Sequence, residues 1–203
     1  MTLITKDFST GYQGNKIVKS INLSLVRSEW LGIIGANGSG KSTFLKGISR
    51  ILDVYGGSAY LYGNNIHNAS TKEVAKKISI LPQHQSSTLT LTVYELVCLG
   101  RSPHKKWWEL DLDKNDHSKV ERSIELTDMA AFRDKTVDTL SGGQRQRAFL
   151  SLALAQDAKT LLLDEPTTFL DLRYQLQFLD LLKKINREQK ISIVTVIHDL
   201  NLA

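Results

Sequence analysis

The feature that most constrains this chain of 203 residues is the stretch GANGSGKS at residues 35–42. The apolar run WLGII precedes it and reads as a buried strand, while Phe44, Leu45 and Ile48 follow at helical spacing. A glycine-rich turn of the pattern G-x-x-x-x-G-K-S between a strand and a helix is typical of a loop that wraps phosphate oxygens. A turn with a chance Lys-Ser pair is the alternative, and the strand and helix on either side argue against it.

The residue types in this loop suit an anionic ligand. Glycines let the backbone approach phosphate oxygens closely, and successive amide N–H groups at a helix N-terminus present positive potential. Lys41 can reach the β- and γ-phosphates of a nucleotide, and the Ser42 hydroxyl can coordinate Mg²⁺, which prefers oxygen ligands. The residues expected to bind a nucleotide here are Gly35, Ala36, Asn37, Gly38, Ser39, Gly40, Lys41, Ser42 and Thr43.

A pair of acidic residues closes the apolar run LLLDE at residues 161–165. Asp164 ends a buried strand, where a carboxylate is costly unless it has a partner, and Mg²⁺ with its water shell would be that partner. Glu165 comes next, so it points differently and could polarise an attacking water. A solvated pair of acids at a strand end is the alternative, and the intact phosphate loop argues against it.

Other patterns indicate an α/β core. Residues 1–30 alternate in places and predict short antiparallel strands, and SAYLY predicts a strand between turns at Gly56-Gly57 and Gly63-Asn64. The runs ISILPQ, TLLLD and ISIVTVIH predict further strands, the last two buried on both faces as in parallel sheets. The helix between those two is expected to carry an apolar stripe of Leu176, Leu179, Leu182 and Ile185.

Residues 90–135 are helical in pattern and polar, and carry no convincing strand. Thr92 with Glu95 forms a capping-box arrangement, and Asp113 or Asn115 could open a second helix. The stretch RSPHKKWW is expected to be an exposed loop. We therefore expect a single domain in which residues 1–86 and 156–203 form the α/β core and residues 87–155 form an inserted helical subdomain.

Composition excludes some classes of protein. Hydrophobic residues make up 41% and charged residues 23%, which argues against disorder. The net charge of +5 is spread along the chain, so no nucleic-acid partner is expected. One cysteine excludes an internal disulfide, no run approaches the roughly 20 apolar residues of a membrane span, and no secretion signal is visible. If this protein acts at a membrane, another component must hold it there.

Several motifs occur together in a fixed order: GANGSGKST, the Gln83 of LPQ, LSGGQRQR, LLLDEPT, Asp171 in FLD and His198 in VIHD. Together they resemble the nucleotide-binding subunits of ATP-binding-cassette (ABC) transporters, over essentially the whole chain. The LSGGQ motif distinguishes this family from many other phosphate-loop enzymes, which lack it. The resemblance implies an α/β P-loop NTPase (RecA-like) core with an N-terminal antiparallel β subdomain and an inserted α-helical subdomain.

The resemblance also implies roles for single residues. The catalytic set would be Glu165, His198, Gln83 and Lys41, with His198 holding the γ-phosphate and the attacking water; the metal set would be Ser42, Gln83 and Asp164. Tyr12 would stack on adenine, although a packing role is the alternative. The signature residues Ser141, Gly142, Gly143 and Gln144 would contact the γ-phosphate held by a second copy, with Asp171 at the dimer contact, so that two chains sandwich two ATP molecules.

Stretches such as GRSPHKK and DEPTTFLDLRYQ further resemble the importer ATPases for iron-siderophore complexes. Such a subunit would lie on the cytoplasmic face of the membrane, held by a permease and served indirectly by a substrate-binding protein. Residues 86–108 would form the permease groove, with Trp107 and Trp108 either anchoring the permease or covering the subdomain's own core.

Other functions are weighed beside this one. Within the class, the cargo could instead be haem, cobalamin or another compound. A soluble ABC-type ATPase of DNA repair or translation is a further alternative, but those usually carry a long coiled-coil insertion or two cassettes, and neither is here. A binding module without turnover is disfavoured by Glu165 and His198.

Two departures from the family pattern stand out. Ser28-Glu29 replaces the usual Gly-Glu, which implies a turn that tolerates a side chain. The chain also stops at Ala203, soon after His198, whereas family members continue with further strands and helices. We therefore expect a truncated C-terminal end, with a sheet edge and a helical cover missing and ATPase activity weakened.

Overall fold

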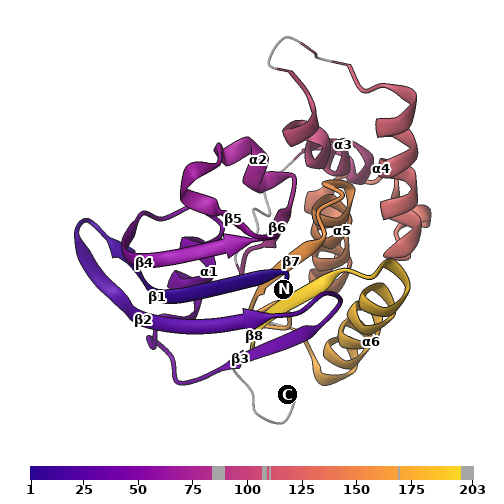
Figure 1. Ribbon diagram of the computed structural model, residues 1–203. Helices are drawn as coiled ribbons and strands as arrows, with labels where there is room; N and C mark the ends of the chain where they lie inside the picture. Colours follow the sequence, from indigo (N-terminus) through magenta and orange to yellow (C-terminus); the bar gives the residue numbers. More distant parts are fainter. Residues whose placement is uncertain (84–89, 107–108, 110, 169, 198–203) are drawn as a thin grey trace.

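The computed structural model describes residues 1–83, 90–106, 109, 111–168 and 170–197. Its strands form two four-stranded sheets, one antiparallel in the order β2-β1-β4-β5 and one parallel in the order β3-β8-β7-β6. Figure 1 shows the antiparallel sheet beside the parallel one, with helices α3 and α4 set apart from both sheets. The structure confirms the predicted fold class.

The antiparallel sheet begins with a tight hairpin. Strands β1 (Leu3–Tyr12) and β2 (Asn15–Leu25) pair with Tyr12 opposite Asn15. The loop residues Gln13 and Gly14 both have positive φ, 47° and 82°, which suits the two-residue turn whose twist matches the strands. Strands β4 (Val54–Leu61) and β5 (Asn64–Asn65) complete the sheet.

The predicted turn at Gly56-Gly57 is wrong, because both glycines lie inside β4. The register of β4 against β1 shifts between Lys6 and Ser9, and Gly57 has φ 68° there. A Cβ on Gly57 would lie 2.2 Å from the carbonyl oxygens of Lys6 and Asp7. The glycine therefore marks a bulge where two backbones approach closely, and not the end of a strand.

The parallel sheet consists of β3 (Trp30–Ile34), β8 (Ser192–Ile197), β7 (Thr160–Asp164) and β6 (Ile78–Leu81). Every residue of β7 and β8 is buried, as predicted. The prediction that β3 is buried is wrong: its residues are half-buried or exposed, and Ile34 is 44% exposed. In the described part of the chain β3 pairs with β8 alone, so only one of its edges is covered.

Three α-helices flank the sheets: α1 (Lys41–Ile48), α2 (Thr71–Ala75) and α6 (Leu172–Gln189). The predicted stripe on α6 is only partly correct. Leu182 and Ile185 are buried together with Phe178 and Leu181, whereas Leu176 is 50% exposed. The apolar face of α6 thus begins two residues later than the sequence pattern indicates.

The helical region contains α3 (Val93–Cys98), α4 (Lys114–Leu126) and α5 (Gly142–Ala155). Thr92 and Glu95 form the predicted capping box, and Asp113 caps α4. Short 3₁₀ segments complete the described elements; they are η1 (Ile66–Asn68), η2 (Leu99–His104), η3 (Ala130–Phe132) and η4 (Val137–Thr139).

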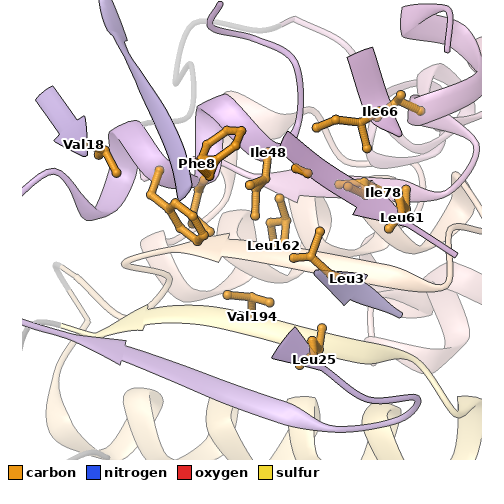
Figure 2. Close-up of a cluster of buried hydrophobic side chains, with 14 of the residues drawn as sticks. Leu3, Phe8, Val18, Leu25, Ile48, Leu61, Ile66, Ile78, Leu162 and Val194 are labelled. Carbon is orange, nitrogen blue, oxygen red and sulfur yellow. The ribbon is translucent and has the colours of Figure 1, made fainter. Parts of the chain in front are cut away.

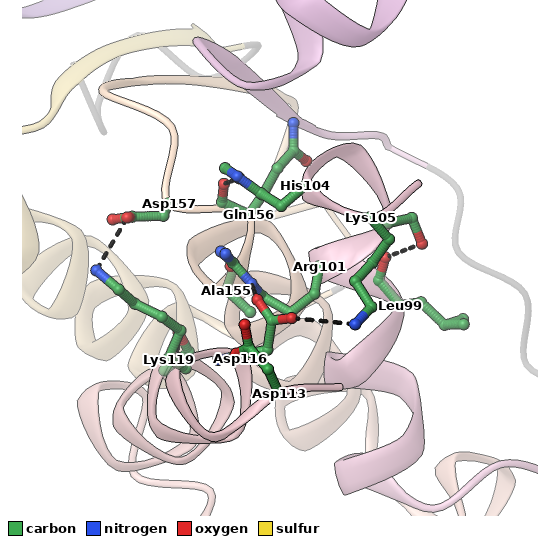
Figure 3. Close-up of polar contacts among 12 residues, drawn as sticks. Leu99, Arg101, His104, Lys105, Asp113, Asp116, Lys119, Ala155, Gln156 and Asp157 are labelled. Atoms are coloured by element: carbon green, nitrogen blue, oxygen red, sulfur yellow. Dashed lines mark hydrogen bonds and ion pairs between the residues drawn. The ribbon is translucent and has the colours of Figure 1, made fainter. Parts of the chain in front are cut away.

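The stretch RSPHKKWW is not simply an exposed loop. Its first residue, Arg101, lies in η2, is only 3% exposed, and pairs with Asp116 of α4 at 2.8 Å (Figure 3). Trp107 and Trp108 lie outside the described residues. A guanidinium can be buried here because a carboxylate and the Ala155 carbonyl both accept its hydrogen bonds.

The two sheets share one hydrophobic core. Figure 2 shows Leu3, Phe8 and Leu61 of the antiparallel sheet packed toward Leu162 and Val194 of the parallel sheet. A second cluster joins the parallel sheet to α5 and α6, and a third lies among α3, α4 and α5. Helix α5 contributes to both of these clusters, so it packs on the core as well as on the helical region.

Among the residues that the structure describes, no helix combines the length and the apolar character needed to cross a membrane.

Candidate nucleotide site

The loop of residues 35–40 leaves the end of β3 and leads directly into α1. Gly38 and Gly40 have φ of 76° and 92°, a left-handed conformation that side chains rarely adopt. The Lys41 ammonium donates to the carbonyl oxygens of Gly35 and Ala36, at 2.8 and 2.9 Å. The loop therefore curls around the lysine, which places a positive charge against its concave backbone.

Helix α1 and strand β7 meet at a pair of oxygen-bearing side chains. The Ser42 hydroxyl donates to Asp164 Oδ1 at 2.7 Å, although the two residues are far apart in the sequence. Asp164 is 3% exposed, and this burial raises the pKa of its carboxyl above the usual range, against the effect of the Ser42 hydrogen bond. The structure thus brings together two of the residues predicted to bind a metal.

Glu165 has hydrogen-bond partners that differ from those of Asp164. Its Oε2 accepts a hydrogen bond from Gln83 Nε2 at 2.7 Å and one from Thr168 Oγ1 at 3.2 Å. Its backbone has φ 48°, a left-handed conformation that is uncommon for a residue with a side chain. The two consecutive carboxylates thus have different partners: Asp164 accepts from Ser42, and Glu165 accepts from Gln83 and Thr168.

The signature stretch lies at the start of α5. Ser141 caps this helix, and its backbone N–H and hydroxyl exchange hydrogen bonds with Gln144 in a capping box. A Cβ on Gly143 would lie 3.5 Å from the ring of Tyr174, an ordinary contact distance, so the first turn of α6 lies beside the start of α5. Ser141 and Gly142 are exposed. This leaves their outer surface open.

The remaining predicted site residues are placed as follows. Asp171 caps α6, with its carboxylate accepting from the Tyr174 N–H at 3.0 Å. Tyr12 ends β1 and is 43% exposed. His198 lies outside the described residues. The roles of Asp171, Tyr12 and His198 therefore stay predictions.

The sequence reading missed Thr168, which contacts the Glu165 carboxylate directly. A signal was present in the stretch Glu165-Pro166-Thr167-Thr168. Proline favours the second position of a β-turn, and a threonine hydroxyl can reach back to a neighbouring residue. The Thr168 N–H does close this turn on the Glu165 carbonyl at 3.2 Å.

These features together define a class of protein. A strand, a glycine loop that holds a lysine, a serine beside a buried aspartate and a glutamate on the same strand end form a phosphate-loop nucleotide-binding domain.

Comparison with known proteins gives the family. A family model described as ABC transporter matches residues 18–168, and the chain belongs to this family. It is 45% identical over 202 residues to the iron(3+)-hydroxamate import ATP-binding protein FhuC of Bacillus subtilis, covering 100% of this chain and 75% of that protein. It is 42% identical to the achromobactin transport ATP-binding protein CbrD of Dickeya dadantii, covering 100% of this chain and 76% of that protein.

A solved structure agrees with the fold. A dimeric ATP-binding cassette bound to ADP and phosphate superposes with a TM-score of 0.79 at 29% identity, covering 99% of this chain and 90% of that one. The chain is therefore an ABC-type ATPase.

Proposed function

We propose that this chain is the ATP-hydrolysing subunit of an importer for iron-siderophore complexes. The observation that carries the hydrolytic part is the arrangement at the end of β7, where Asp164 meets Ser42 and Glu165 meets Gln83. The similarity to proteins named for hydroxamate and achromobactin transport supports the cargo. Haem, cobalamin or another cargo remains the alternative within the class.

The residues at the site suit a nucleotide with Mg²⁺. The loop N–H groups and the Lys41 ammonium bind the phosphates. Ser42 and Asp164 offer the hard oxygen ligands that Mg²⁺ prefers, and they already lie 2.7 Å apart, so the site fits the ion, with Gln83 as the third predicted ligand. When bound, the ion neutralises charge on the phosphate oxygens. Glu165 polarises the attacking water, and His198 holds that water and the γ-phosphate.

A second copy of the chain completes each site in this proposal. Ser141, Gly142, Gly143 and Gln144 form a helix N-terminus, a position that suits a γ-phosphate held by the partner, and Ser141 and Gly142 are exposed there. Asp171 lies at the start of α6, whose Tyr174 ring packs on this stretch, and would contact the partner there. Tyr12 is exposed at the end of β1, where it can stack on adenine.

In this proposal the chain lies on the cytoplasmic face of the membrane, where a permease holds it. An open cavity of about 490 Å³ lies between α2 and the segment after α3; it is lined by Lys72, Cys98, Leu99, Ser102, Lys105, Lys106, Glu109 and Leu112. Much of this lining falls within the predicted permease groove of residues 86–108. A substrate-binding protein would deliver the cargo on the other side, and no nucleic acid is involved.

Transport tests this function. The protein is co-purified with its permease, reconstituted into vesicles with ATP and Mg²⁺ facing the subunit, and supplied with a radiolabelled ferric hydroxamate and its binding protein. We expect uptake of the ferric hydroxamate that requires ATP. Parallel assays supply haem or cobalamin as the cargo instead. Uptake of haem or cobalamin in place of the iron chelate would move the cargo to that alternative. Recovery of nucleic acid and no permease would reject the transporter function.

A further inference from the structure

We propose that Thr168 is a positioning residue for hydrolysis, which orients the carboxylate of Glu165 toward the attacking water. This inference rests on the proposed role of Glu165. Its starting observation is that the Thr168 hydroxyl and the Gln83 amide both donate to the same oxygen, Glu165 Oε2, at 3.2 and 2.7 Å.

The turn from Glu165 to Thr168 sets this contact locally. The Thr168 N–H donates to the Glu165 carbonyl at 3.2 Å, and Pro166 occupies the second position, where its fixed φ favours the turn. Thr168 therefore holds residue 165 twice, by its backbone and by its side chain. The turn keeps Glu165 in its left-handed backbone conformation, which the surrounding structure must stabilise.

The other side of the turn is held by α6. The side-chain amide of Gln175 donates to the Leu170 carbonyl at 2.8 Å and to the Thr167 carbonyl at 3.3 Å. Asp171 caps the same helix, so the helix start and the turn form one hydrogen-bonded unit. The turn that carries Thr168 is thus held on one side by the Glu165 carbonyl and on the other by Gln175.

For hydrolysis, it matters which of the two Glu165 carboxylate oxygens accepts these hydrogen bonds. In the described part of the chain, the hydrogen bonds to the Glu165 carboxylate all reach Oε2. Holding Oε2 with two donors restricts the rotation of the carboxylate, so that Oε1, which accepts from none of the described residues, has a set direction in which to accept a hydrogen bond from water. A general base works only within hydrogen-bond reach of the proton that it takes, so loss of one holding contact slows the chemical step more than it weakens ATP binding.

The test compares three threonine variants. Thr168→Val keeps the branched shape and removes the hydroxyl, Thr168→Ser keeps the hydroxyl, and Thr71→Val makes the same chemical change at an exposed position at the start of α2. For Thr168→Val we expect kcat for ATP hydrolysis to fall about 5- to 10-fold, with KM for ATP and the melting temperature unchanged. Thr168→Ser should recover at least about half of the wild-type kcat, and Thr71→Val all of it.

A result with Thr168→Val within about twofold of wild type, or with Thr168→Ser no better than Thr168→Val, overturns the inference. A matching rise in KM or a lower melting temperature would also overturn it, because the residue would then support binding or folding. In a Glu165→Gln background, Thr168→Val should cause no further loss. If Glu165→Gln itself hydrolysed ATP at a near wild-type rate, the proposed role of Glu165 would fail, whatever Thr168 does.

Discussion

At the level of single residues, the site depends on two consecutive acids with different surroundings. Asp164 ends a strand that is buried throughout and has the Ser42 hydroxyl as its partner, whereas the half-buried Glu165 accepts hydrogen bonds from Gln83 and Thr168. Burial raises the pKa of Asp164, which means that the folded chain without bound nucleotide disfavours the ionised carboxylate. Asp164 is suited to bind a cation, and its ionised carboxylate lowers the stability of the folded chain when no cation is bound.

Asp164→Asn tests this penalty. A raised folded-state pKa means that Asp164 contributes stability at low pH that is lost as the pH rises through the folded pKa. At neutral pH the neutral amide should therefore raise the melting temperature of the nucleotide-free protein, by about 2–4 °C, while its oxygen still accepts from Ser42. The gain should vanish at acidic pH, and Mg²⁺ with ATP should stabilise the variant less than wild type. Thermal melts across pH measure both effects; an Asn variant that melts lower at neutral pH would contradict the assignment.

At the level of elements, a buried ion pair ties the helical region together. Arg101 of η2 donates to Asp116 of α4 and to the Ala155 carbonyl at the end of α5, and Lys105 approaches the other Asp116 oxygen at 3.4 Å (Figure 3). The next residue, Gln156, donates to the Ile78 carbonyl at 2.8 Å. Because β6 runs from Ile78 toward Gln83, this contact links the helical region to the strand that positions the Glu165 partner.

The pKa of Asp116 shows which effect wins in this pair. Burial alone would raise it, but the Arg101 hydrogen bond and charge outweigh burial and hold the pKa below its usual value. The pair therefore contributes stability above the unfolded-state pKa of an aspartate, which is lost as the pH falls through the lower folded pKa.

Arg101→Met should destabilise the protein by about 3–5 kcal/mol at neutral pH, because it leaves a buried carboxylate with Lys105 as its remaining cationic partner. Arg101→Met combined with Asp116→Leu should recover part of that loss, since the buried carboxylate is then gone and the Lys105 ammonium still donates to the Asp111 carbonyl. Asp134→Ala, which breaks an ion pair with Arg133 at an 82% exposed side chain, should change stability by less than about 0.5 kcal/mol. Urea denaturation measures all three, and a double variant no more stable than Arg101→Met would contradict this account.

Some of the helices and strands could be predicted from the sequence, and others could not. The phosphate loop, the two capped helices and the buried strands β7 and β8 follow from local patterns, and the structure has them. The wrong predictions share a cause, because the surroundings of each residue depend on parts of the chain that are distant in the sequence. Gly57 passes close to β1, Arg101 finds Asp116, and Leu176 lies beyond the face of α6 that other elements cover. The contact of Thr168 with Glu165 was missed for a different reason: it is local, but the hydroxyl of a threonine in a turn can bond to several neighbouring groups, and the sequence does not say which.

At the level of the whole molecule, the two predicted halves of a nucleotide site lie on different elements. The phosphate loop joins β3 to α1, and the signature stretch opens α5, whose Leu150 and Ala153 pack in the cluster that includes β7 and α6. The side chains of Ser141 and Gln144 bond within their own capping box. The two side chains are therefore held within their own helix start, and Ser141 and Gly142 are exposed, as expected of a surface that a second copy would use.

Dimer formation tests this use of the exposed surface. Glu165→Gln should bind ATP, lose most hydrolysis and accumulate as a dimer with ATP and Mg²⁺, which size-exclusion chromatography with light scattering would detect as a doubled mass. Adding Ser141→Arg should keep the protein monomeric while ATP still binds, because the bulky charge lies on the outer surface and not in the phosphate loop. Adding Lys41→Ala should instead weaken ATP binding itself, by about 10-fold or more, since it removes the ammonium that the loop encloses. If Ser141→Arg abolished ATP binding to the monomer as fully as Lys41→Ala, the signature stretch would act within its own chain.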